Sequence, residues 1–112
     1  MSKFEETLTK YEGEMKKLGV KYDADLLRKV TKACGPSIYN RDASTVSTSD
    51  EGELNTVRNN FCIKKLGLKD GPEIDKAFGK IKDTFGASNK NKYRAIFYYL
   101  LTKEFKKESI FN

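Results

Sequence analysis

The chain has 112 residues, a length that fits one domain built around one hydrophobic core. Hydrophobic residues make up 38% and charged residues 34%, with a net charge of +6 and no histidine. The lack of histidine excludes Ser-His and Cys-His nucleophiles, histidine bases and histidine metal ligands. Enzyme chemistry is therefore disfavoured, although not excluded, and we expect no metal or other cofactor.

The two cysteines, Cys34 and Cys62, lie far apart in the sequence. Two thiols without histidine make neither a disulfide framework nor a usual zinc site. We expect both to be reduced and mostly shielded as small buried hydrophobes. No apolar run approaches the length of a membrane span, and the N-terminus lacks the apolar segment of a signal peptide. These features predict a cytoplasmic protein without membrane contact.

The first predicted helix covers residues 2–18, and Gly19 is a favourable residue for its C-terminal end. Its apolar residues recur at spacings of three and four, which forms one face of a helix. They are Phe4, Leu8, Tyr11, Met15 and Leu18. A second helix is predicted from about Asp23 to the Gly35-Pro36 pair, followed by a short helix from Pro36 to about Arg41.

Residues 42–50 are rich in hydroxyl side chains, which favour turns and caps over regular structure. We expect no strand here, and Val46 should be tucked inward. The third helix starts around Asp50, where two capping boxes compete, Thr48 with Glu51 and Asp50 with Glu53.

The third helix is expected to end at Gly67, and the fourth runs from Pro72 to Gly86. The last begins after Ser88 or Asn89, opening with Lys90 and Lys92. From Ala95 to Leu101 every residue is apolar or aromatic, so this helix should be buried on most sides. The pattern predicts an all-α fold, a compact single-domain bundle of four main helices plus a short one, with the C-terminal helix central.

Two regions are candidate binding sites. The first is a ligand or anion loop leading into a helix N-terminus, with arginines nearby. Its residues are Arg41, Asp42, Ser44, Ser47, Ser49 and Arg58. Because acidic residues already cap this helix, we favour a structural role, with Arg41 and Asp42 pairing to different helices and Arg58 a potential partner of Asp42.

The second candidate is a basic face that could hold nucleic acid or another polyanion. Its residues are Lys64, Lys65, Lys69, Lys90, Lys92 and Arg94. A solvated surface without a partner explains the same lysines more simply. The tyrosines of the last helix, Tyr93, Tyr98 and Tyr99, are expected to bury their rings and to place hydroxyls on partners or at a crevice.

Four stretches together resemble a known family: residues 40–50, residues 53–61, Lys64-Lys-Leu-Gly-Leu68 and Phe97-Tyr-Tyr-Leu-Leu101. They are similar to the small bacterial family catalogued as domain of unknown function 2853. The resemblance covers most of the chain and implies a bacterial single-domain protein. It implies no catalytic residue, because no activity is assigned to the family.

The leading functional hypothesis is a small helical protein that acts by binding, with another protein as the favoured partner. A non-specific nucleic-acid or polyanion binder is the alternative, and a small-anion site at Arg41–Asp50 is the second alternative. An exposed apolar patch would favour a protein partner, a contiguous basic face would favour a polyanion, and a pocket joining Arg41, Asp42 and Arg58 would favour a ligand site. The partner and the oligomeric state stay open.

Overall fold

A computed structural model describes residues 2–86, 89 and 92–111. This part of the chain forms five α-helices, joined by shorter helical turns, and contains no β-strand. The all-α fold predicted from the apolar spacing is confirmed. The expected opening of the last helix at Ser88 and Lys90 lies outside the described residues.

The helix α1 (Lys3–Lys17) begins at an N-cap, Ser2, whose hydroxyl accepts a hydrogen bond from the Glu5 amide. It ends in a Schellman motif, because Gly19 has a φ of 71° and the Val20 amide donates to the Met15 carbonyl. The helix α2 (Ala24–Cys34) begins at the predicted cap, Asp23. The short helix predicted after it is a 3-10 turn, η1 (Gly35–Tyr39).

The helix α3 (Glu51–Val57) is capped by Asp50, which accepts from the Gly52 and Glu53 amides. It continues without a break into a π-helical segment, η2 (Arg58–Ile63), which the periodicity does not predict. The helix α4 (Pro72–Phe85) has Gly71 at its N-cap position and a proline at its first residue, as predicted. After the helix α5 (Arg94–Glu104), the chain closes with a 3-10 turn, η3 (Glu108–Phe111).

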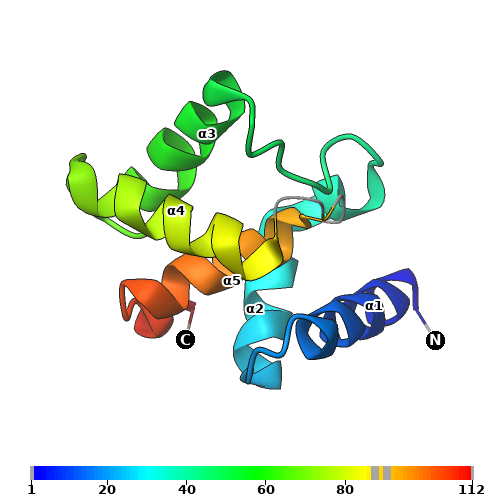
Figure 1. The fold of residues 1–112 in the computed structure, drawn as a ribbon. Helices are drawn as coiled ribbons and strands as arrows, with labels where there is room; N and C mark the ends of the chain where they lie inside the picture. Colours follow the sequence, from blue (N-terminus) through cyan, green and yellow to red (C-terminus); the bar gives the residue numbers. More distant parts are fainter. Residues whose placement is uncertain (1, 87–88, 90–91, 112) are drawn as a thin grey trace.

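The helix α5 forms the centre of the molecule, as its apolar run predicts. It packs against α1, α2 and α4, and in Figure 1 it crosses behind α4 with α2 below it. Six of its eleven residues are buried: Ala95, Ile96, Phe97, Tyr99, Leu101 and Thr102. Phe97 contacts the rings of Phe78 and Phe85 from α4, so aromatic packing joins the two helices.

The start of α5 differs from the prediction. The helix begins at Arg94 and not near Asn89, because Tyr93 is extended and forms an isolated antiparallel bridge with Thr45. The segment 40–50 arches from η1 to α3 at the side of the molecule (Figure 1). Within it Val46 is 3% exposed, which confirms its role as the apolar anchor.

No helix formed by the described residues combines the length and the apolar character needed to cross a membrane.

Candidate functional site

The segment 40–46 is fixed to the start of α5 through its backbone. The Arg94 amide donates to the Ser44 carbonyl at 2.7 Å, and the Val46 amide donates to the Lys92 carbonyl at 2.8 Å. Asn40 shapes the preceding turn, because its Oδ1 accepts hydrogen bonds from the amides of Asp42 and Ala43. The hydroxyl-rich loop therefore has one defined conformation that needs no ligand.

The guanidinium of Arg94 adds side-chain hydrogen bonds to this backbone attachment. It donates to the Ala43 carbonyl at 2.8 Å, to the Tyr98 hydroxyl at 3.0 Å and to Glu53 Oε1 at 3.0 Å. The side chain is only 17% exposed. Arg94 thus connects the loop, α3 and α5, and it does not belong to an accessible basic face.

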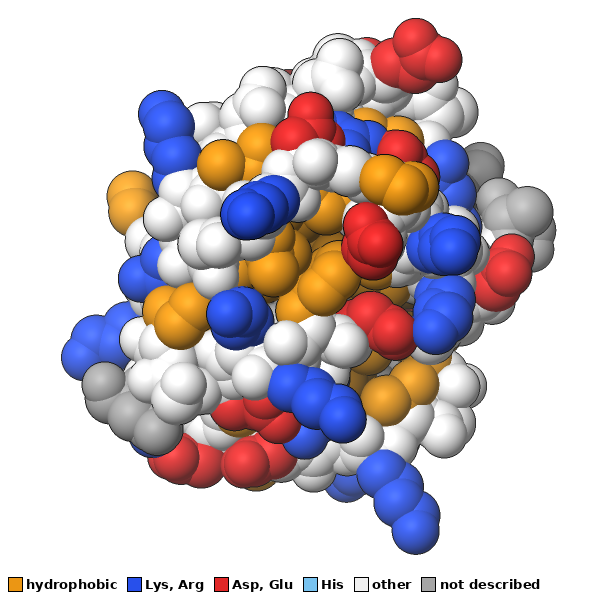
Figure 2. All heavy atoms as spheres, turned by 90° about the vertical axis from the view of Figure 1, so that its left-hand side faces the viewer, with side chains coloured by type: hydrophobic (Ala, Val, Ile, Leu, Met, Phe, Trp, Pro, Cys, Tyr) orange, Lys and Arg blue, Asp and Glu red, His pale blue; other side chains and the backbone are white. Residues whose placement is uncertain are grey.

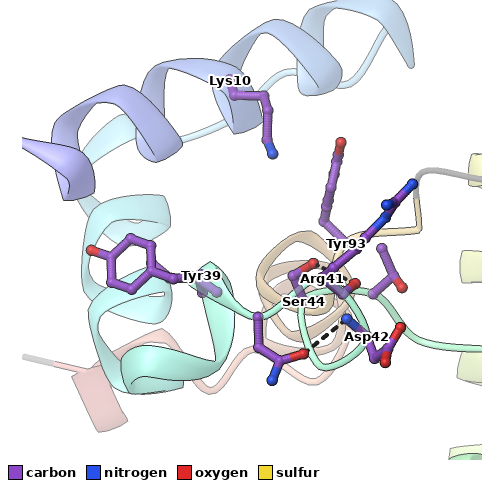
Figure 3. A pocket seen from close by; sticks show the side chains of 9 residues that line it. Lys10, Tyr39, Arg41, Asp42, Ser44 and Tyr93 are labelled. Atoms are coloured by element: carbon purple, nitrogen blue, oxygen red, sulfur yellow. Dashed lines mark hydrogen bonds between the residues drawn. The ribbon is translucent and has the colours of Figure 1, made fainter.

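A pocket of about 560 Å³ lies between α1 and this loop. Figure 3 shows Lys10 reaching down from α1, with Tyr39 on one side and Arg41 and Tyr93 on the other. We name this cavity the α1–loop pocket. Its lining residues are Lys10, Ile38, Tyr39, Asn40, Arg41, Asp42, Ser44, Thr45 and Tyr93.

The α1–loop pocket contains two cations that are not neutralised by an ion pair with the described residues. The ammonium of Lys10 lies 4.8 Å from the centre of the Tyr93 ring and 5.7 Å from that of Tyr11, which are cation–π distances. Arg41 is exposed. Asp42 on the pocket wall offsets one of the two charges, so the lining carries a net positive charge.

The ring of Tyr11 packs against the ring of Tyr93, which lines the pocket, with the two ring centres 4.9 Å apart. Its hydroxyl is buried and has no hydrogen-bond partner among the described residues. Burial raises the pKa of this phenol strongly, and the neighbouring Cys34, Tyr93 and Tyr39 raise it further. Tyr11 therefore stays neutral and contributes no charge to the pocket.

The predicted anion loop is divided between two places. Arg41, Asp42 and Ser44 line the α1–loop pocket, whereas Ser49 and Arg58 line a separate hollow beside α4. Ser47 lies outside both lining sets and is exposed, with its hydroxyl 3.5 Å from that of Ser49.

The suggested pairing of Arg58 with Asp42 is wrong. Arg58 instead binds the carboxylates of Asp70 and Asp75 while its guanidinium covers the ring of Phe78. The π-helical turn starts at Arg58, Asp70 lies two residues before α4 and Asp75 lies in the first turn of α4, which places these groups together. Arg41 and Asp42 form no ion pair with any described residue, so they do not pin the loop as expected.

The predicted basic face is also divided. Lys64, Lys65 and Lys69 are exposed and lie in the segment that follows η2. Lys92 is half-buried, and its ammonium donates to the Asn89 carbonyl. Since Arg94 is turned inward, neither it nor Lys92 joins the exposed lysines, and Lys90 lies outside the described residues.

Both cysteines are free thiols, with Cys62 buried and Cys34 partly shielded. Burial raises the pKa of each thiol to about 12. The tyrosine hydroxyls of α5 find partners as expected: that of Tyr99 accepts from the Asp23 amide at 2.8 Å, and that of Tyr98 accepts from Arg94. No group of three or more acidic or cysteine side chains within the described ranges is arranged to hold a metal ion.

Sequence reasoning missed Lys10, Tyr39 and Asn40 as site residues. Lys10 belongs to the polar face of α1, where a cation normally faces solvent, and no local pattern relates it to Arg41. Only the packing of α1 beside the loop brings the two cations to one pocket. The Asn40-Arg-Asp sequence did contain a usable signal, because an asparagine side chain often accepts a hydrogen bond from the backbone amide two residues further along the chain, which forms an Asx turn.

Comparison with known proteins agrees with the resemblance noted in the sequence. No curated protein matches the chain. A family model described as "Protein of unknown function (DUF2853)" matches residues 10–109, which include Lys10, the loop and α5. The chain therefore belongs to the DUF2853 family.

Proposed function

We propose that this protein acts by binding, and that its principal ligand is a small anion held in the α1–loop pocket. The observation that carries the proposal is the pair of cations, Lys10 and Arg41, which line the pocket without an ion-pair partner in the described structure. Charged side chains that are not paired in the protein are available to a charge-assisted hydrogen bond with a ligand. The Tyr93 side chain adds a hydroxyl at the same wall.

A protein partner, the leading hypothesis from the sequence, has less geometric support. Figure 2 shows a hollow with hydrophobic side chains, surrounded by charged ones. Within the described residues, however, Tyr39 is the only large hydrophobic side chain that is well exposed, at 39%. Interfaces of stable complexes usually present a larger apolar patch.

Titration of the full chain with inorganic phosphate, followed by amide NMR at low ionic strength, tests the proposal. Lys10→Ala and Arg41→Ala should each weaken binding by about tenfold or more, because a hydrogen bond to a charged group contributes about 1.5–3 kcal/mol. Asp42→Asn should strengthen binding, since it removes the opposing carboxylate from the wall.

Lys16→Ala is the matched control for Lys10→Ala. It removes the same charge from the same helix, but Lys16 is exposed and does not line the pocket. If the two variants weaken phosphate binding equally, the effect is general electrostatics and the proposed site is wrong.

A polyanion site remains a second candidate because Lys64, Lys65 and Lys69 are exposed and form no ion pair with described residues. Fluorescence titration with duplex DNA at several salt concentrations tests it. Binding that weakens steeply with salt and is reduced by combined Lys64→Glu and Lys65→Glu changes would support this candidate. Undetectable binding at low salt would exclude it.

A further inference from the structure

From the layout of the α1–loop pocket, we infer that its ligand is a phosphate monoester joined to a planar aromatic ring, the chemistry of a nucleoside monophosphate, with the ring against Tyr39 and the phosphate between Lys10 and Arg41. This inference rests on the proposed function and specifies the class of anion. Three features of the pocket support it, namely its size, its division into two ends and the exposure of Tyr39.

The size of the pocket favours a ligand larger than an inorganic ion. A cavity of about 560 Å³ falls within the range of pockets that hold organic small molecules, roughly 300–1,000 Å³. A bare phosphate or sulfate would contact the cations and leave most of this space to water. The ligand should therefore carry an organic body together with its charge.

The pocket has two chemically different ends. Figure 3 shows Tyr39 on one side, whereas Arg41 and Tyr93 lie on the other and Lys10 extends between them. The charge-binding groups are thus separated from the exposed aromatic ring. A ligand that uses both ends must have its anionic group and its flat group at opposite ends, as a mononucleotide has.

The side chain of Tyr39 is 39% exposed, whereas the aromatic rings of the core are nearly inaccessible. Lys3 places its ammonium over this ring, 4.9 Å from its centre, so one face of the ring already meets a cation and a base would stack on the other face. Bases stack on exposed aromatic side chains because every base has a π-face, and each such contact contributes substantially to affinity. Tyr39 therefore suits a planar ring better than a flexible aliphatic chain.

Two probes that differ only in the base test the inference, adenosine 5′-monophosphate and ribose 5-phosphate, titrated into the full chain by calorimetry. The nucleotide should bind about tenfold more tightly, within the range expected for one stacked base. Tyr39→Ala should abolish this difference, whereas Tyr39→Phe should preserve it. Arg41→Ala should weaken both ligands, because both carry the phosphate.

The outcomes separate this inference from the proposed function. Equal affinities for the two probes, both reduced by Arg41→Ala, would overturn the aromatic ligand and leave the anion pocket supported. A preference for the nucleotide that survives Tyr39→Ala would overturn the placement of the ring. If inorganic phosphate, ribose 5-phosphate and the nucleotide all fail to bind, both proposals fall.

Discussion

Replacing Arg94 by methionine should destabilise the protein strongly. The change keeps the apolar stem of the side chain and removes the guanidinium that contacts Ala43, Tyr98 and Glu53. The Glu53 side chain is 27% exposed, so its carboxylate is left partly desolvated without its cation. Loss of one partner from such a pair costs more than the pair's net contribution.

The magnitude follows from these contacts. Hydrogen bonds of charged groups contribute about 1.5–3 kcal/mol, and three bonds from one group are not additive, so we expect a loss of about 3 kcal/mol. At about 2.1 cal/mol/K of unfolding entropy per residue, that loss lowers the Tm by about 13 °C. Arg94→Lys can restore at most part of the network, so its Tm should lie between those of the parent protein and of Arg94→Met.

Urea and thermal unfolding, followed by far-UV circular dichroism, measure the effect. Arg28→Met is the matched control, because Arg28 also forms an ion pair through two hydrogen bonds, with Glu5, but is 46% exposed. Exposed ion pairs contribute little, so this variant should barely change the Tm. If both variants melt alike, burial of the Arg94 network does not determine the stability.

Four further predictions concern single groups. Asp50→Ala should cost on the order of 1 kcal/mol in urea unfolding, because it removes the cap of α3, and Asp50→Ser should recover most of this loss. Asn40→Ala should lower the Tm, whereas Arg41→Ala should leave it unchanged, since of these two side chains only that of Asn40 forms hydrogen bonds with described residues; the reverse order would contradict the structure. Tyr11→Phe should be neutral or stabilising, because the hydroxyl it removes is buried without a described partner, and a large loss would indicate a bound water. Both cysteines should label slowly in the native state, and the free energy of unfolding should fall between about pH 9 and pH 12, where the unfolded chain loses thiol protons that the native state retains; a flat profile across this window would refute buried thiols.

The helices were predictable because their boundaries depend on local chemistry. Asp23 and Asp50 cap α2 and α3 through side-chain acceptance of the next amides, a signal contained within three residues. The apolar run in α5 likewise predicts a helix that is buried on most sides, and the central position of that helix follows from this burial. Where neighbouring residues decide the structure, sequence reasoning succeeded.

The errors occur where distant segments compete with local preference. Residues 92 and 93 could have continued the last helix, but pairing with residues 44–46 holds Tyr93 extended and delays α5 to Arg94. The π-helical segment, which the periodicity also does not predict, contains Phe61, whose ring stacks on that of Tyr98 at a ring separation of 4.0 Å. In both cases the contacting residues are far apart in the sequence, so a local pattern cannot reveal the contact.

The same distinction explains the candidate site. The sequence posed a choice for the polar loop, between stabilisation by its own hydrogen bonds and retention of its polar residues for a ligand. The structure supports the first explanation for the loop itself, because the backbone, Asn40 and Arg94 hold it in place. The Arg41 side chain takes no part in that attachment and lines the α1–loop pocket beside Lys10. A loop that is already ordered can hold a cation in position before any ligand arrives, which lowers the entropy cost of binding.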